Sequence, residues 1–438
     1  MKLWEKGIST EASIENFTVG NDRHYDRYLA IYDVKASAAH ARMLHKCGFL
    51  ELLELNQLLE GLSELEEQVA LADFSIPESF EDIHSYIEYY LTDKYGSVGK
   101  KIHTARSRND QVITALQLYV TDSLEQLIES TADFARLLLE LSEKHRDILM
   151  PGYTHLQVAM PSSFGLWLSA YAETLCDDIV ALKAAAVVSN QNPLGSAAGY
   201  GSNFGIDRLL TTELIGFEVV KVNSIASQML RGRIERIAIN AIAQLGATLS
   251  KLAGDICLYM GQDFGFLSFD DEITTGSSIM PHKKNPDVFE LIRAKGNALQ
   301  GVSVQISTIL ANLPTGYHRD LQLTKPMLMD SFLTIEELLS IFSFSLSKMT
   351  PSKALLEQEK YTYLWSVDTL NSMVSAGMPF RDAYKKMAED IATNNYVPNK
   401  EAAHTHLGSI GNLGLDLISK KLEAAVQSGN YSGLSSEK

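Results

Sequence analysis

The sequence contains few of the features that mark secreted, metal-binding or membrane-spanning proteins. It has only 3 cysteines in 438 residues, and no CxxC pair occurs, which excludes zinc ribbons and redox dithiols. Scattered thiols without a pairing pattern are typical of a reducing compartment, so we expect a cytoplasmic protein. The first residues contain no apolar signal-peptide core. No run reaches the roughly 18 apolar residues of a membrane span, so we expect no membrane partner.

Basic residues are also scarce. The 38 Lys and Arg are outnumbered by 54 Asp and Glu, which gives a net charge of −16. A nucleic-acid binder needs a net basic face, so we expect no nucleic-acid partner. A small anionic substrate is not excluded, because a few basic side chains can reverse the field inside a cleft.

The 11 prolines and 28 glycines are few and clustered. Neither residue occurs between positions 100 and 150, where apolar residues recur every three or four positions from Ile113 to Leu141. This spacing predicts one amphipathic helix of about 35–40 residues. Further breaker-free stretches follow, strand signals are scarce and no convincing hairpin is visible. We therefore expect an all-α fold with an N-terminal helical domain (1–105), a central bundle of long helices (106–352) and a small C-terminal helical domain (353–438).

Three polar stretches interrupt the helices, and the first covers residues 103–111, at the start of the long helix. It reads His-Thr-Ala-Arg-Ser-Arg-Asn-Asp-Gln. Two arginines, a serine and an asparagine at a helix N-terminus form a site for an anion, because the backbone donors and the helix dipole act together. A capped helix start facing solvent explains the same composition, and composition alone leaves both interpretations open.

The second stretch, residues 152–157, places Thr, His and Gln in a turn, where an imidazole can serve in acid–base chemistry. A lone histidine in a turn is, however, more often structural. The third stretch, residues 275–286, combines a glycine, paired serines, two prolines and two lysines. Such a loop can close over an anionic substrate. The alternative is a lysine-rich surface loop, although Pro281 and Pro286 restrict the backbone more than a simple linker requires.

The sequence contains no other motif typical of a nucleotide-binding, metal-binding or nucleophilic site. The sequence contains no GxGxxG, no P-loop, no HExxH and no GxSxG. None of the 11 histidines is spaced as a metal ligand with a second His or Cys. We therefore expect no cofactor and no metal.

The polar stretches carry a family resemblance. Residues 276–286 resemble the GSSxMPxKxNP signature of the fumarase/aspartase superfamily, and residues 103–111 resemble the HTGRSRNDQ segment of its argininosuccinate lyase family. Further matches extend from Lys2 to about Asn412. The resemblance implies a three-domain all-α fold whose long helices associate in a homotetramer, with each active site built from three chains. It also implies the reversible elimination of fumarate from argininosuccinate to give arginine.

The resemblance assigns the catalytic roles as follows. Ser277 is the base that removes a proton beside a carboxylate, and Lys283 stabilises its alkoxide and the developing negative charge. Glu290 pairs with His155 and raises its basicity. Thr154 and His155 assist protonation of the leaving nitrogen, and the identity of the acid is left open.

The resemblance also implies a set of substrate-binding residues. The carboxylates are held by Ser107, Arg108, Asn109 and Asn285. Further substrate contacts come from the YxRDLQxxK segment, at Tyr317, Gln322 and Lys325.

Some positions depart from the family pattern. Ala105 and His282 stand where Gly and Gln are usual, and Leu230-Arg231-Gly232 replaces Asp-Arg-Asp. Two alternative functions stay open at this point. Another fumarate-releasing lyase, of the adenylosuccinate lyase or aspartase type, shares the loop but should lack the segment 106–111. A non-catalytic, crystallin-like homologue is free to lose Ser277, which is present.

Overall fold

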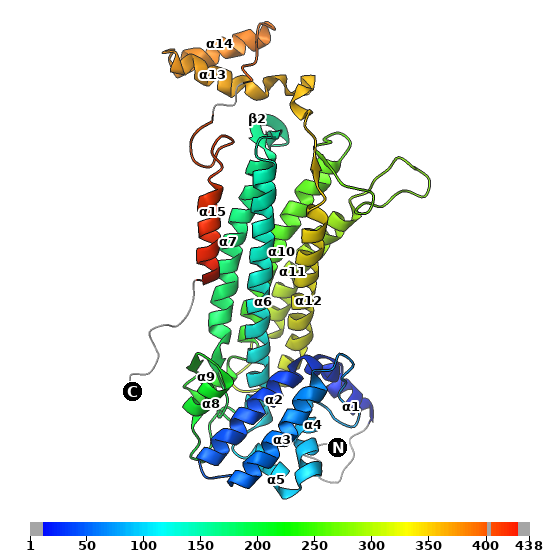
Figure 1. The fold of residues 1–438 in the computed structure, drawn as a ribbon, viewed down its shortest axis with the longest axis vertical. Helices are drawn as coiled ribbons and strands as arrows, with labels where there is room; N and C mark the ends of the chain where they lie inside the picture. The colour runs from blue at the N-terminus through cyan, green and yellow to red at the C-terminus, as the bar shows by residue number, and fades with distance from the viewer. Residues whose placement is uncertain (1–11, 401–403, 428–438) are drawn as a thin grey trace.

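Five long helices lie side by side along the molecule in a computed structural model that describes residues 12–400 and 404–427 (Figure 1). They alternate in direction along the chain, and each contacts at least two of the others. The start of the family resemblance at Lys2 lies outside the described residues. The bundle consists of α6 (Arg108–Lys144), α7 (Phe164–Ser189), α10 (Arg233–Met260), α11 (Asp287–Ile309) and α12 (Thr324–Leu346).

Helix α6 confirms the predicted long helix. It has 37 residues, and Ser107 caps its start in a capping box with Asp110. Its apolar stripe is buried from Ile113 to Leu141. At 1.5 Å per residue the helix is about 55 Å long, so its two ends hold functional segments far apart.

The N-terminal helices form their own core at the lower end of the bundle in Figure 1, where α2 packs on α6. They are α1 (Ala12–Val19), α2 (Asp22–Lys46), α3 (Leu52–Val69), α4 (Ile83–Tyr95), α5 (Ser97–Lys100) and the 3₁₀ turn η1 (Lys101–His103). The connection from α7 to α10 lies at the same end. It contains α8 (Arg208–Ile215), α9 (Ser224–Gln228) and the short parallel strands β3 (Gln191–Asn192) and β4 (Val219–Val220).

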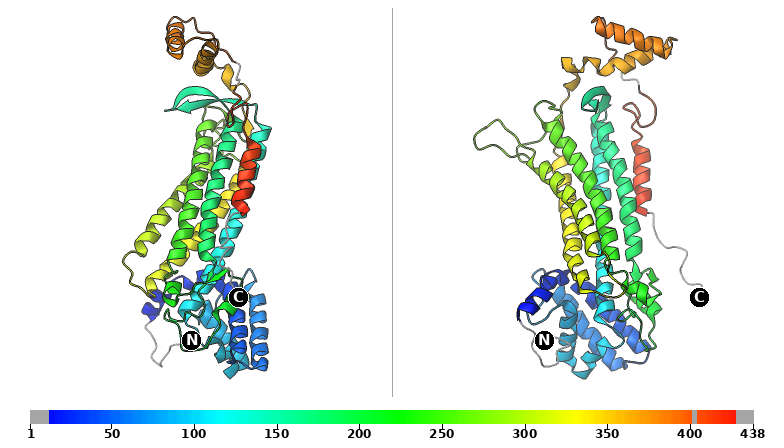
Figure 2. Two further views of the ribbon diagram at one scale, coloured as in Figure 1. Left: turned by 90° about the vertical axis from the view of Figure 1, so that its left-hand side faces the viewer. Right: turned by 180° about the vertical axis from the view of Figure 1, so that it is seen from behind.

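The upper end holds a hairpin that the sequence analysis did not predict (Figure 2). Its antiparallel strands are β1 (Leu149–Thr154) and β2 (Gln157–Ser163). Prolines face each other at Pro151 and Pro161, and the two turn residues are His and Leu instead of the usual Asn and Gly. Because of these residue types, the sequence lacks the pattern that ordinarily predicts a hairpin. The remaining strands, β5 (Leu267–Ser268) and β6 (Thr350–Pro351), are only two residues each.

The C-terminal segment ends in a helix that returns to the bundle. Beyond the turns η3 (Leu355–Glu357) and η4 (Glu359–Trp365), helices α13 (Ser366–Ser375) and α14 (Phe380–Ala392) form the upper tip. Helix α15 (Leu415–Gln427) then packs on α6 and α7. There Arg136 pairs with Glu423 at 3.0 Å, and Lys421 with Asp177 at 3.0 Å. The predicted domain boundaries stay predictions, and this contact ties part of 353–438 to the bundle.

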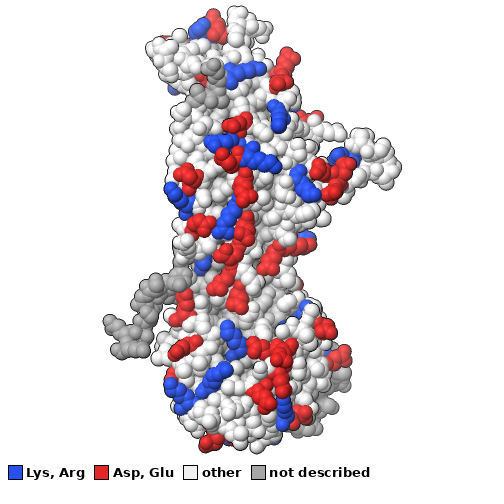
Figure 3. All heavy atoms as spheres, in the orientation of Figure 1, with Lys and Arg blue, Asp and Glu red and all other residues white. Residues whose placement is uncertain are grey.

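The surface agrees with the mixed composition. Figure 3 shows acidic and basic side chains interspersed along one face of the bundle, without a continuous basic surface on that face. Within residues 12–400 and 404–427, no helix is long and apolar enough to cross a membrane.

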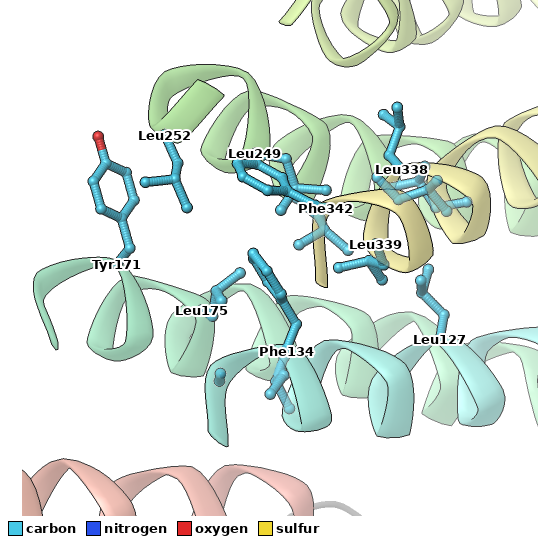
Figure 4. Packing of buried hydrophobic residues seen from close by; sticks show 14 of the residues in the cluster. Leu127, Phe134, Tyr171, Leu175, Leu249, Leu252, Leu338, Leu339 and Phe342 are labelled. Carbon is cyan, nitrogen blue, oxygen red and sulfur yellow. The ribbon is translucent and has the colours of Figure 1, made fainter. Parts of the chain in front are cut away.

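The core of the bundle is built from side chains of α6, α7, α10 and α12 (Figure 4). Phe134 of α6 and Phe342 of α12 lie with ring centroids 5.2 Å apart, and both are buried. Helices α10 and α11 approach closely at two glycines. A Cβ atom on Gly296 would lie only 2.5 Å from the carbonyl oxygen of Gly246, so a larger residue at this crossing would push the helices apart.

Candidate active site

Four of the predicted substrate-binding residues meet in one small cavity at the lower end of the bundle. The cavity has a volume of about 60 Å³. Its walls come from α1, α2, α4, α6, Arg231, the chain between α11 and α12 and the first turn of α12. The predicted residues among them are Arg108, Tyr317, Gln322 and Lys325. These segments are far apart in sequence, so the fold itself assembles this half of the site.

Arg108 enters the cavity from the first turn of α6. Its guanidinium lies 3.3 Å from carboxylate oxygens of both Glu81 and Asp82, and it donates to the hydroxyl of Ser85 at 3.1 Å. These contacts fix the side chain of Arg108, about one-third of whose surface is exposed. Ser107 and Asn109 flank it as the N-cap and the second residue of α6.

The backbone just before this helix is strained. Ala105 has φ of +62°, a left-handed conformation that disfavours any residue with a Cβ atom. This is the position where the family usually has glycine, so the departure leaves the required conformation in place and adds strain.

Lys325 lies between two carboxylates. Its ammonium is 2.6 Å from a carboxylate oxygen of Asp26 and 2.6 Å from one of Asp22. Burial opposes the charge of Lys325, but the two carboxylates outweigh burial and raise its pKa. Burial raises the pKa of Asp22 despite the neighbouring ammonium. The cavity therefore contains fixed charges of both signs, which suits a zwitterionic ligand.

Gln322 joins the same wall to helix α1. Its amide donates to the carbonyl oxygens of Thr18 at 3.0 Å and Val19 at 3.1 Å. Arg319 donates to the Thr18 carbonyl at 2.7 Å. The segment that carries Tyr317, Gln322 and Lys325 is therefore held by α1 as well as by its own helix.

His84 lines this cavity and was not assigned a role from the sequence. Its Nδ1 lies 2.7 Å from a carboxylate oxygen of Asp33, which also accepts from the amide of Gln111. Burial opposes protonation, but Asp33 outweighs it and raises the pKa of His84. Its Nε2 is buried and has no partner in the part of the chain that the structure describes. His84 is therefore a buried imidazole held by Asp33 through one ring nitrogen and unpaired at the other.

The spacing of polar residues along α2 indicates this buried polar group in the sequence. Asp26, Asp33 and His40 are seven residues apart, and all three are fully buried. Charged groups at helical spacing on a buried face indicate a polar network rather than a solvated face. Sequence analysis missed them because it followed the polar stretches between helices instead.

Thr154 and His155 lie at the opposite end of α6 from Arg108. Both are exposed at the tip of the β1–β2 hairpin, and neither side chain has a hydrogen-bond or ion-pair partner among the described residues. His155 and Leu156 have φ of +54° and +57°, so two side-chain-bearing residues occupy left-handed positions of a tight turn. The turn leaves the imidazole exposed.

The loop that carries Ser277 projects from the side of the bundle (Figures 1 and 2). A two-residue bridge closes its base, where the backbone N–H of Asn285 donates to the Thr275 carbonyl at 2.9 Å. The hydroxyl oxygen of Ser277 accepts from the backbone N–H of Met280 at 3.2 Å and of Ile279 at 3.4 Å. These donors stabilise negative charge on that oxygen.

Lys283 and Glu290 are exposed, the first in the loop and the second in the first turn of α11. No hydrogen bond or ion pair joins Glu290 to His155 within the described residues. The chain therefore brings together one group of predicted residues at the lower end and leaves the others apart. The described residues also contain no group of three or more His, Cys, Asp or Glu arranged to hold a metal ion.

Comparison with known proteins decides the family. Residues 5–301 match the lyase family. Argininosuccinate lyase of Bacteroides fragilis is 47% identical over 99% of this chain and 97% of its own. That of Phocaeicola vulgatus is 48% identical over 98% and 97%, and that of Sorangium cellulosum 39% over 97% and 99%. The chain belongs to the argininosuccinate lyase family.

Solved structures support the fold of this argininosuccinate lyase family member. EDDS lyase in complex with formate aligns with a TM-score of 0.75 at 22% identity, over 96% of this chain and 91% of that chain. The fumarate lyase:delta crystallin of Brucella melitensis bound to cobalt aligns with a TM-score of 0.73 at 15% identity, over 94% of each. The mostly helical architecture is therefore that of the fumarate lyases, as predicted.

Proposed function

We propose that this protein catalyses the reversible elimination of fumarate from argininosuccinate, which leaves arginine. The observation that carries the proposal is the match over 99% of the chain to relatives that bear this name. The segment 106–111, which separates this family from other fumarate-releasing lyases, opens onto the cavity at Arg108. The protein would act in arginine biosynthesis, and its isolated cysteines support a cytoplasmic location.

Proton removal is assigned to Ser277. A serine hydroxyl is a poor base unless its alkoxide is stabilised, and two backbone N–H groups already point at its oxygen. The alkoxide takes the proton next to a carboxylate of the substrate, and the electron pair moves into that carboxylate as an aci-carboxylate. Lys283 supplies positive charge for the alkoxide and for this intermediate.

Departure of the leaving group completes the elimination. The aci-carboxylate collapses to the double bond of fumarate, the carbon–nitrogen bond breaks, and the guanidino nitrogen accepts a proton. Thr154 and His155 are proposed to assist this protonation, with Glu290 orienting the imidazole. His84, held by Asp33, is a second candidate donor.

Binding of the substrate is assigned to both groups of residues. Arg108 with Ser107 and Asn109 would hold carboxylates of the succinyl part, together with Asn285 from the loop. Tyr317, Gln322 and Lys325 would hold the amino-acid end. Charged groups of both signs in the lower cavity support this division, because the amino-acid end carries an ammonium and a carboxylate.

A single chain is incomplete for this reaction, so we propose a homotetramer with active sites shared between subunits. The hairpin and Arg108 lie at opposite ends of a helix of about 55 Å. The lower cavity, about 60 Å³, is far smaller than the roughly 300 Å³ or more typical of a small-molecule pocket. Exposed apolar residues along the bundle, such as Leu291, Val304 and Phe344, support burial against other copies.

A direct assay tests the proposed function. The purified protein is mixed with argininosuccinate, and fumarate is followed by its ultraviolet absorbance, with adenylosuccinate and aspartate in parallel. We expect fumarate from argininosuccinate alone. Fumarate from another of the three would keep the loop chemistry and reject the specificity assigned to 106–111. No fumarate from any of them, from a folded protein, would indicate a non-catalytic homologue.

A further inference from the structure

The segment Leu230-Arg231-Gly232 departs most from the family pattern, because both acidic neighbours of the arginine are missing. The structure explains why they are not accommodated here. Gly232 has φ of +76°, and a Cβ atom on it would lie 2.3 Å from the side chain of Leu310. Leu230 is buried in the core of the bundle. Arg231 is itself only 6% exposed, so its charge needs another partner.

Glu235, one helical turn further along α10, is that partner. Its carboxylate oxygen Oε1 accepts from Nε of Arg231 at 3.2 Å, and both side chains are buried. The same oxygen lies 3.1 Å from the hydroxyl of Thr324. Arg231 in turn donates from its Nη2 to the carbonyl oxygen of Leu321 at 2.9 Å.

These contacts are made with the segment that carries the predicted substrate-binding residues. Leu321 immediately precedes Gln322, and Thr324 immediately precedes Lys325. Arg231 also lines the lower cavity beside both of them. The pair of Arg231 and Glu235 therefore connects the start of α10 to the backbone that aims Gln322 and Lys325.

We propose that Glu235 is a positioning residue for substrate binding. It orients Arg231 at the cavity, and through Leu321 and Thr324 it fixes the segment Arg319–Lys325. The inference rests on the proposed function and deepens it, because it names the residue that pairs with Arg231 in place of the missing aspartates.

Stability alone is a weak explanation for this pair. Two charges buried together lose their hydration, and an apolar pair of similar size is often at least as stable. The second oxygen of Glu235, Oε2, is buried without a partner within the described residues, which adds to that cost. A pair with this geometry is better explained by the backbone that it holds than by the stability that it contributes.

The test is Glu235→Gln in the full-length protein, with steady-state kinetics on argininosuccinate. We expect KM to rise about tenfold, the effect of one weakened charge-assisted hydrogen bond, while kcat changes less than about threefold. Amide hydrogen exchange of residues 319–325 should become faster than in the wild type, because the segment loses its tie to α10. Glu235→Asp, which keeps the charge on a shorter side chain, should raise KM less than Glu235→Gln does.

Asp178→Asn is the matched control, since Asp178 is a buried carboxylate in the bundle that does not line the lower cavity. It should leave KM and the exchange of residues 319–325 unchanged. Unchanged KM and exchange in Glu235→Gln would reject the positioning role, as would changes equal to those of Asp178→Asn. Failure of the proposed function is a separate result. It appears as a wild type without fumarate release, and the exchange measurement still decides the role of Glu235.

Discussion

The lower cavity and the proposed catalytic segments at the upper end differ in how much of their geometry one chain supplies. In the cavity, Lys325 is 4% exposed and has two carboxylate partners, and Arg108 has three polar neighbours. At the hairpin tip and in the loop, His155 and Lys283 are exposed and have no such partners among the described residues. The lower cavity is preorganised within the chain, whereas the groups proposed for the chemistry are exposed on it. In the proposed tetramer, neighbouring subunits and substrate would surround those groups.

Because of this difference, we expect substitutions in the two regions to change different properties of the protein. Side chains in the cavity have already lost their hydration and rotamer freedom on folding, so their replacement should change stability as well as binding. Side chains of the loop and hairpin contribute little packing, so their replacement should change turnover alone.

The largest effect is expected for Ser277→Ala. Removal of the proposed base should lower kcat by about 10³-fold or more. The free energy of unfolding should change by less than about 0.5 kcal/mol, because the side chain is in a projecting loop. Fumarate release and urea unfolding measure the two quantities. Turnover within a few-fold of the wild type would remove Ser277 as the base.

The loop was also where sequence was most informative. Its signature is a contiguous run, and so is the segment 103–111 that contains Arg108, so both could be singled out without knowledge of the fold. The long helix α6 was predicted from its uninterrupted apolar spacing. The residues that sequence missed, such as Asp22 and His84, reach the cavity from separate helices, and only tertiary packing reveals that they meet.

Lys325→Met and Lys283→Met compare the two regions directly. Without Lys325, the buried carboxylate of Asp26 lies beside the partly buried carboxylate of Asp22, and the free energy of unfolding should fall by about 3–5 kcal/mol. Lys283→Met should leave stability within about 0.5 kcal/mol and lower kcat by about 10²-fold. Chemical denaturation and the fumarate assay are run on both variants. Equal stability losses in the two would contradict the comparison.

A pH effect on stability is expected from Asp110. Its carboxylate accepts from the backbone N–H groups of Ser107, Gly195 and Ala197, yet burial raises its pKa from 3.8 to about 6. Between these values the folded state binds more protons than the unfolded state. This contribution to stability is therefore present below about pH 4 and is lost as the pH rises to about 6, by about 3 kcal/mol at most.

Asp110→Asn removes that titration. We expect the stability difference between the variant and the wild type to change across pH 4 to 6 and to be constant above pH 7. Unfolding curves in urea at fixed pH values measure it. A difference that stays constant from pH 4 to 6 would mean that the carboxyl keeps its ordinary pKa in the folded protein.

The smallest effect is expected at Ala105, where the chain keeps a backbone conformation suited to the family's glycine. A left-handed alanine costs about 1–2 kcal/mol, while glycine loses about 0.4–1 kcal/mol more backbone entropy on folding. Ala105→Gly should therefore stabilise the protein by about 0.5–1 kcal/mol, measured by urea unfolding. KM should stay within about twofold, because the capping box of Ser107 and Asp110 already fixes the start of α6. A destabilised variant would show that the alanine methyl group, which is buried, contributes more packing than its backbone strain removes.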